Sequence, residues 1–530
     1  MSNKLVKKTA NQKAENTGAD VAKGIIEYTL GVIGIALCVL VPLYLKDGYH
    51  SVGTVKYELY QWIMLVGFIS LAVLTLIYWM MQNGVGKWEA THTDWCVLAF
   101  LVLALIAAVA GGNFKDCVQG YNGWNMGLVA LFSFGLLYFY FSRFGKYYPM
   151  VLVCLCGAAM IAFTIGILHR LLIDPIGTYD GIDDVYKNQF LSTLGQATWY
   201  SSFVCTVLPL GIGVFWCGKK TWQRVVSGVF SLAGFCTMIT QNSDSAYMAL
   251  AGFLAVFLWF SAGNAKRMER FMEILLLLVA ATRIMNILFA VHPNPILQMD
   301  AISNFFVFHN FMWVITGIVA LFWAVSLFCS CKGIYSVKAA LIIRNIIFIL
   351  IVAAVLAAGG ILIMSAKGVL PENIAAVTSK IPYLTWSDSW GNGRGMTWAF
   401  SFQMFGDMDF LHKLFGVGPD GYAPYAYTLY QDRLAQMWGE RTLTNAHNEW
   451  LNAVINYGLL GAAAYIGIFV NAIREFAREQ LEKPVMVGFI ACVVSYMCHN
   501  FFCYQQVCCT PFLFLIIGAG MYMKLQTESV

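Results

Sequence analysis

Apolar runs of about 20 residues recur along nearly the whole chain, and they constrain its folding more than any other feature. A helix rises about 1.5 Å per residue, so one such run crosses a hydrocarbon core of ~30 Å. Backbone polar groups find no water inside a bilayer, so each run is expected to be helical. We predict an all-α, polytopic integral membrane protein with about 14 transmembrane helices. The predicted spans are 25–45, 60–81, 95–112, 124–142, 149–168, 197–217, 225–241, 245–262, 271–291, 309–329, 343–364, 450–471, 485–503 and 509–523.

The composition excludes a soluble protein. Hydrophobic residues make up 59% of the 530 residues and charged residues only 12%, whereas a soluble protein carries roughly 25% charged residues. The net charge of +5 comes from cations in short connecting loops, so no nucleic-acid partner is expected. The first span lacks a small-residue cleavage site, and it therefore reads as a signal anchor rather than a cleaved signal peptide.

Lysine and arginine in the short loops predict the orientation in the cell membrane. Clusters such as Lys219-Lys220 and Lys266-Arg267 fall on one side, and few cations fall in the short loops on the other. Cation-rich loops stay in the cytoplasm, so both termini are predicted to be cytoplasmic. The predicted regions are a cytoplasmic basic tail (1–24), eleven transmembrane helices (25–365), an external loop (366–449), and three further helices with a short tail (450–530).

The segment 366–449 is long and polar, and we predict that it carries the functional residues outside the membrane. Aromatic and apolar residues at helical spacing predict a helix over 395–415. The glycine and proline cluster FGVGPDGY, at 415–422, predicts a turn. Residues 424–438 have the amphipathic pattern of a helix that lies along a membrane interface.

The stretch AHNEWLNAVINYGLLG, at 446–461, carries the candidate chemistry. His447 stands where the external loop re-enters the membrane, and an imidazole can accept a proton near neutral pH. Asn448, Asn452 and Asn456 recur every four residues, so they share a helix face that is expected to line a cavity or the bundle interior. We predict His447 as catalytic base and Asn448 and Asn452 as substrate contacts. The alternative for His447 is a histidine that only satisfies backbone groups at a helix start.

Arginines supply candidate contacts for phosphate, because a guanidinium binds phosphate oxygens in paired hydrogen bonds. Arg394 lies among glycines and tryptophans in WGNGRGMTW, and we predict that it binds substrate. Arg441 is a second candidate, but for Arg441 and Arg433 a solvated loop position is the simpler interpretation. Arg283 lies within an apolar run, where a charge costs at least ~2.5–3.5 kcal/mol. It is therefore predicted either to bind substrate or to extend toward the outer face.

The sequence gives little support for a metal site or a cofactor. Asp407 and Asp409 have the DxD spacing of divalent-cation sites, and Asp183-Asp184 is a second acidic pair. Such pairs are common by chance, and we interpret them as loop or helix-end carboxylates. The cysteines fall mostly in apolar runs without metal-ligand spacing. No Walker-type phosphate loop occurs in the sequence, and we expect no metal and no other cofactor.

These elements resemble the O-antigen ligase/polymerase family of membrane glycosyltransferases. AHNEWLNAVINYGLLG has the H-N-x9-G-x-x-G pattern, with FGVGPDGY upstream and GRGMTW at the start of the external loop; the resemblance covers residues 235–461. It implies a GT-C-like fold and a metal-independent, inverting enzyme. Such an enzyme takes a glycan from undecaprenyl pyrophosphate at the outer leaflet and passes it to a hydroxyl. The resemblance also implies His447 as the base and Arg394 as a pyrophosphate contact.

One position departs from the family pattern. The family often has an arginine after serine at the outer entry of an earlier span, whereas this chain reads QNSDSAYMAL, with Asp244 and Ser245 there. Either Arg283 replaces the missing cation, or the donor binds differently and Asp244 contacts sugar hydroxyls. Asp244 is therefore included among the predicted substrate contacts.

The sequence thus predicts a membrane glycosyltransferase for cell-surface polysaccharide assembly. Its expected partners are a lipid-linked oligosaccharide donor, an acceptor (a glycan, lipid or protein) and the membrane. The main alternative is a lipid-linked glycan flippase or another polytopic transporter, with a substrate site near the midplane between related halves. A scaffold subunit without chemistry is a third interpretation. The sequence does not distinguish a polymerase from a ligase.

Overall fold

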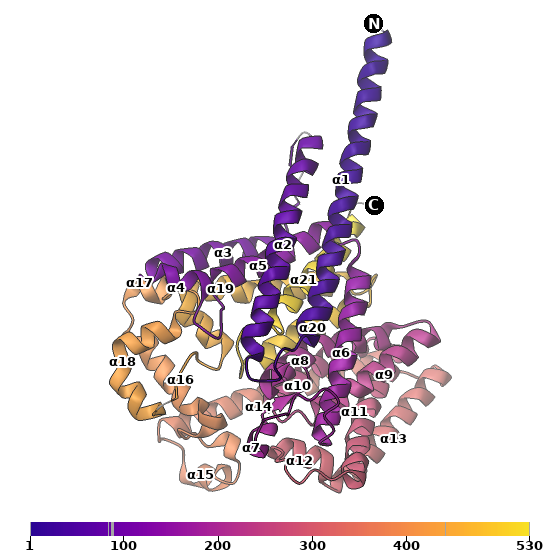
Figure 1. Cartoon of the computed structure of the whole chain (residues 1–530). Helices are drawn as coiled ribbons and strands as arrows, with labels where there is room; N and C mark the ends of the chain where they lie inside the picture. The colour runs from indigo at the N-terminus through magenta and orange to yellow at the C-terminus, as the bar shows by residue number, and fades with distance from the viewer. Residues whose placement is uncertain (1, 83, 86–88, 440, 529–530) are drawn as a thin grey trace.

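The computed structural model describes residues 2–82, 84–85, 89–439 and 441–528, and these residues form helices joined by short loops (Figure 1). The helices are α1 (Ser2–Leu43), α2 (Val52–Met81), α3 (His92–Ala110), α4 (Phe114–Gln119), α5 (Leu128–Phe144), α6 (Tyr148–Arg170), α7 (Asp184–Lys187), α8 (Ala197–Cys217), α9 (Thr221–Met238), α10 (Ser245–Ser261), α11 (Ala265–Val291), α12 (Ala301–Phe308), α13 (Phe311–Lys332), α14 (Val337–Ala366), α15 (Glu372–Thr378), α16 (Trp390–Asp407), α17 (Phe410–Phe415), α18 (Tyr422–Trp438), α19 (Glu449–Glu479), α20 (Met486–His499) and α21 (Thr510–Glu528), with one 3₁₀ turn, η1 (Pro382–Leu384). Strands β1 (Phe190–Leu191) and β2 (Gly195–Gln196) pair as an antiparallel hairpin.

Nine helices of the described part of the chain are long and apolar enough to cross a membrane: α1 from Gly18 onward, α2, α3, α6, α8, α11, α13, α14 and α19. Three shorter apolar helices, α5, α10 and α20, add to them. The remaining predicted spans, 225–241 and 509–523, lie mostly within α9 and α21. The chain is therefore an all-α protein with the helices of a multi-pass membrane protein. The predicted tail 1–24 belongs to α1, and the side chains before Gly18 lie outside the described residues.

Buried polar groups show how the apolar helices are joined. Lys56 of α2 is fully buried, and its ammonium group donates to the carbonyl oxygens of Val41, Pro42 and Tyr44 at 2.8, 3.1 and 2.9 Å. The last carbonyls of a helix have no partner within the helix, so a cation there compensates them. Lys56 therefore closes the end of α1 and joins it to α2.

The centre of the bundle is α8, the most deeply buried of the long apolar helices described. It packs closely against α20: a Cβ added to Gly213 of α8 would lie 2.6 Å from the Cα atom of Gly488. Glycine at both positions permits this backbone approach. By contrast, no residue in the most apolar stretches of α13 and α14 is fully buried inside the chain.

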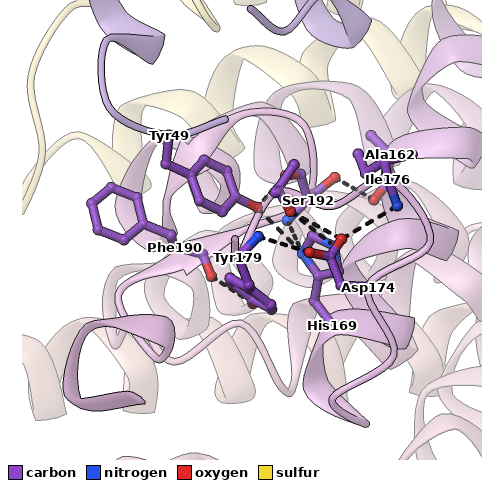
Figure 2. Close-up of polar contacts among 9 residues, drawn as sticks. Tyr49, Ala162, His169, Asp174, Ile176, Tyr179, Phe190 and Ser192 are labelled. Carbon is purple, nitrogen blue, oxygen red and sulfur yellow. Dashed lines mark hydrogen bonds and ion pairs between the residues drawn. The ribbon is translucent and has the colours of Figure 1, made fainter. Parts of the chain in front are cut away.

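The loop that follows α6 is held by a buried polar cluster (Figure 2). The backbone N–H of Ser192 donates to Nδ1 of His169 at 3.1 Å, so the ring proton lies on Nε2, which faces Asp174 Oδ1 at 3.2 Å. The hydroxyl of Tyr49 donates to the carbonyl oxygen of Ser192. Tyr49 comes from the α1–α2 loop, so the cluster joins two segments at the same end of the bundle.

The predicted external loop forms a helical region at one side of the bundle, where α16, α17 and α18 lie together (Figure 1). The helix predicted over 395–415 is two helices, α16 and α17, separated at Met408-Asp409 because Asp409 accepts from His412 N and begins a new helix. The amphipathic helix predicted over 424–438 corresponds to α18, which is bent at Tyr430.

Candidate functional site

A kink in α19 explains why the motifs FGVGPDGY and AHNEWLNAVINYGLLG lie together. Gly458 has φ +68°, which interrupts the helix and frees the carbonyls of the preceding turn. Val417 N donates to Ile455 O at 3.1 Å, and Gly418 N donates to Asn456 O at 2.9 Å. A Cβ at Gly458 would lie 2.3 Å from the Leu414 carbonyl, so only glycine fits there. The external region is thereby fixed against α19.

His447 lies in a tight turn immediately before α19. Its φ is +48°, and its N–H donates to Asn445 Oδ1 at 2.8 Å. An asparagine at this spacing forms a side-chain turn that tolerates the left-handed conformation of the next residues. Asn448 then caps the helix, because its Oδ1 accepts from Leu451 N at 3.0 Å.

The His447 ring is half-buried and packs edge-on against Tyr504, with ring centroids 5.3 Å apart. Within the described part of the chain, no group hydrogen-bonds to either ring nitrogen. Burial, together with the positive charge of Arg394, lowers the pKa of His447 to about 4. The imidazole is consequently neutral at neutral pH, with one nitrogen able to accept a proton.

Arg394 is held at the start of α16 by an unusual turn. Gly391, Asn392 and Gly393 all have left-handed backbone angles. This turn brings the Gly391 carbonyl to Arg394 Nη1 at 2.7 Å, while Nη2 donates to Phe502 O at 3.0 Å. The guanidinium also lies 5.6 Å from the centroid of the Phe502 ring. Burial lowers the pKa of Arg394 from its ordinary value, but an arginine remains charged at physiological pH.

His447 and Arg394 contact the same short segment between α20 and α21. Arg394 binds Phe502, and His447 packs on Tyr504, two residues further along. Two residues of extended chain span at most about 7 Å, so the guanidinium and the imidazole approach one another over this segment. Burial is the larger cause of the lowered pKa of His447, and the charge of Arg394 adds to it. The structure therefore brings together the two residues on which the sequence-based hypothesis depends.

Asp244 belongs to the same neighbourhood. The hydroxyl of Tyr383 donates to its Oδ2 at 3.1 Å, and the carboxylate interacts electrostatically with Arg394. Burial raises the pKa of Asp244, and the nearby Asp300 adds to the effect. Asp244 Oδ1 is buried and has no hydrogen-bond partner among the described residues. Arg394 thus interacts electrostatically with both the His447 imidazole and the Asp244 carboxylate.

Buried donors without acceptors also gather around Arg394. Its Nε, together with Nε1 of Trp398 and Nε1 of Trp438, lacks a hydrogen-bond partner in the described residues. Trp438 lies against Gly393, and the Trp398 ring stacks on Phe502 with centroids 5.7 Å apart. Native proteins leave few buried polar groups unsatisfied. Orphaned N–H groups beside a guanidinium are suited to an anionic ligand.

The other predicted contacts lie elsewhere or serve the backbone. Arg283 Nη2 donates to Phe306 O and Val307 O at 2.7 and 3.1 Å, and its guanidinium lies 5.2 Å from the Trp313 ring centroid. It joins α11 to α12 and α13, because the end of α12 offers unpaired carbonyls. Arg441 is exposed. Asn448 acts as a helix cap, and Asn452 Oδ1 accepts from Ala446 N at 3.3 Å.

The carboxylates considered for a metal are used locally. Asp407 accepts from the hydroxyl of Tyr430 at 2.8 Å, and Asp409 caps α17. Over the described residues, no group of three or more histidine, cysteine, aspartate or glutamate side chains could hold a metal ion.

Glu449 is a buried residue of the site region that the sequence analysis did not single out. Its carboxylate accepts from the hydroxyls of Tyr465 and Tyr496 and from Asn500 Nδ2, and its N–H donates to Asn500 O at 2.9 Å. His499, beside Asn500, lies within hydrogen-bonding distance of the hydroxyls of Ser201 and Ser245. The sequence signal that could have identified Glu449 is a glutamate at a membrane entry, two residues after His447.

No protein-family model and no curated protein matches this chain. The resemblance to the O-antigen ligase/polymerase family accordingly stays a prediction made from the sequence motifs.

Proposed function

We propose that the protein is a membrane glycosyltransferase that transfers or polymerises a glycan from a polyprenyl-pyrophosphate donor to a hydroxyl acceptor. The observation that carries the proposal is the meeting of a neutral His447 imidazole and the Arg394 guanidinium over the segment from Phe502 to Tyr504. In the proposed arrangement, the 14 apolar segments form a GT-C-like bundle, and the site faces the side of the membrane away from the termini.

The proposed roles follow from the chemistry of each group. His447 accepts the proton of the acceptor hydroxyl while that oxygen bonds to the anomeric carbon. The bond from the anomeric carbon to the pyrophosphate oxygen breaks with inversion. Arg394 and the unpaired N–H groups of Trp398 and Trp438 stabilise the negative charge of the departing pyrophosphate. Asp244 binds sugar hydroxyls in this proposal, which its unpartnered oxygen supports.

A pKa of about 4 makes His447 a weak base in the empty site. The negative charge of a bound pyrophosphate opposes the effect of Arg394, so it would raise the pKa of His447 toward the working pH. The donor itself thereby activates the base. The base therefore gains strength only when the donor is bound.

Transfer from a purified lipid-linked donor, in the presence of EDTA, tests the proposal. The wild-type protein should form product, and His447→Ala and Arg394→Ala should each lower the rate by at least about 10²-fold. Arg441→Ala, which changes an exposed arginine, serves as the matched control and should retain the rate. Full activity in folded His447→Ala protein would refute the role of the imidazole.

Proteoliposomes distinguish the enzyme from the flippase alternative. Movement of a fluorescent lipid-linked glycan across the membrane, without any new glycosidic bond, would refute the transferase. A ladder of products would indicate a polymerase, and a single added block would indicate a ligase.

A further inference from the structure

A cavity of about 450 Å³ lies between the α3–α5 connection and the FGVGPDGY turn. Its volume falls within the roughly 300–1,000 Å³ typical of small-molecule sites. The side chains that line it include the amides of Asn113 and Asn122, the rings of Tyr121 and Tyr425, and two carboxylates, Asp116 and Asp420. Within the described residues, no lysine, arginine or histidine lines this cavity.

Asp420 lines both this cavity and a second, smaller one. It is buried, has φ +57°, and accepts through Oδ2 from Tyr121 N at 2.8 Å and Met126 N at 3.1 Å. These bonds fix the carboxylate between the two loops. The same residue lines a polar pocket of about 10 Å³, which has room for about one water-sized group.

The small pocket contains two orphaned polar atoms of opposite kind. Asn456 Oδ1 is an acceptor without a donor, and Gln505 Nε2 is a donor without an acceptor; the residues are only 2% and 8% exposed. A hydroxyl group can donate to one and accept from the other. Tyr504 also lines this pocket and packs against His447, so the pocket lies directly beside the proposed base.

The charge of the two linings excludes an anionic ligand. Asp116 and Asp420 repel phosphate and carboxylate groups, and the described lining residues offer no cation to offset them. Amides, tyrosines and carboxylates together provide many hydrogen-bonding groups and two aromatic rings. These groups are suited to a neutral, polyhydroxylated molecule.

We propose that the larger cavity binds the ring of an uncharged carbohydrate, and that one hydroxyl of this carbohydrate reaches past Asp420 to lie between Asn456 and Gln505. As the acceptor site of a transferase, this inference rests on the proposed function. In this arrangement the anionic donor is held at Arg394, and the neutral acceptor lies beside Tyr504, against which His447 packs.

Binding of the fluorescently labelled full-length protein, in lipid nanodiscs, to an array of neutral and acidic oligosaccharides tests the inference. Neutral glycans should bind, and their sulfated or sialylated counterparts should bind at least about tenfold more weakly. Gln505→Met should weaken neutral-glycan binding by about tenfold, as expected for one lost buried hydrogen bond. Gln506→Met is the matched control, because Gln506 is also buried with an orphaned amide atom but lines a different pocket.

Asn122→Ala gives a second variant at an exposed lining position, where folding is preserved; it should also weaken binding. Binding of no neutral glycan, a preference for acidic glycans, or equal binding by the Gln505 and Gln506 variants would overturn the inference. If the protein shows no transfer activity, but Gln505→Met weakens glycan binding and Gln506→Met does not, the carbohydrate site stands and only the role of its ligand as acceptor fails.

Discussion

Arg394 donates a hydrogen bond to the carbonyl oxygen of Phe502, 108 positions further along the chain, at a distance of 3.0 Å. The bond joins the start of α16 to the turn between α20 and α21, on which the His447 ring also packs through Tyr504. Neither segment alone would place a cation beside the imidazole. The following expectations depend on this junction.

Arg394→Lys keeps the positive charge but removes the planar fork that reaches two carbonyl oxygens, Gly391 O and Phe502 O. We expect transfer to fall by about 10²–10³-fold, close to the effect of losing one preorganised donor. The rate of glycan transfer at saturating donor measures this effect. Arg441→Lys provides the control at an exposed position, and equal rates for both variants would contradict the proposed role of the fork.

The protonation of His447 should respond to pyrophosphate. Histidine hydrogen–deuterium exchange, followed by mass spectrometry, should give a pKa of about 4 for His447 in the empty protein. Adding inorganic pyrophosphate should raise this pKa, because the anion offsets Arg394. In Arg394→Gln protein the pKa should be higher at the outset and insensitive to pyrophosphate. A pKa that pyrophosphate does not change would argue against an anion site beside the ring.

The same lowered pKa predicts a loss of stability in acid. The unfolded chain binds a proton at His447 once the pH falls below its ordinary value of 6.5, but the folded protein does so only near pH 4. The contribution of His447 to stability is therefore complete above pH 6.5 and is lost as the pH falls from 6.5 to about 4. His447→Gln should make the melting temperature less dependent on pH in this window.

Glu449→Gln should destabilise the protein, because an amide cannot accept from Tyr465, Tyr496 and Asn500 in the same way as a carboxylate. Leaving one buried donor unpaired costs about 1–3 kcal/mol. Thermal unfolding in detergent should show the lowered stability. The exposed Glu482 is the matched control; if Glu482→Gln lowers stability to the same extent, the Glu449 network contributes nothing specific.

Asp420→Asn should stabilise the protein at neutral pH but not in acid. Burial raises the pKa of Asp420 from 3.8 to about 6, although its carboxylate accepts hydrogen bonds from two backbone N–H groups, which lower the pKa. Protonated Asp420 therefore contributes to the stability of the folded protein below pH 3.8, and this contribution is lost as the pH rises to about 6. The melting temperature of the variant relative to wild type should rise across this window and level off above it. A difference that stays constant with pH would refute the titration.

Arg283→Met tests whether this arginine serves packing or substrate. Its guanidinium is engaged by Phe306 O, Val307 O and the Trp313 ring, so we expect lower thermal stability and an unchanged KM for the lipid-linked donor. An increased donor KM with unchanged stability would instead support the alternative in which Arg283 replaces the family arginine.

Local regularities were predictable from the sequence alone. All the predicted apolar spans lie largely in helices, because a run of about 20 apolar residues has few other stable states in lipid. The turn at FGVGPDGY and the amphipathic α18 follow from residue types at short spacing, whereas Asn448, predicted as a substrate contact, is the cap of α19. The sequence also indicated His447, which stands before a polar helix face, and Arg394, which lies among glycines and tryptophans.

Only the tertiary structure decided which of these residues meet. Arg394 and Arg283 look alike in sequence as isolated cations, but one binds Phe502 at the α20–α21 turn and the other binds the end of α12. Distant partners, tens or hundreds of residues away in the sequence, determine the roles of Glu449, Gln505 and Asp420. Helix formation depends on neighbours in sequence, whereas burial, electrostatic proximity and a shared cavity depend on how distant segments pack, and no local pattern encodes that packing.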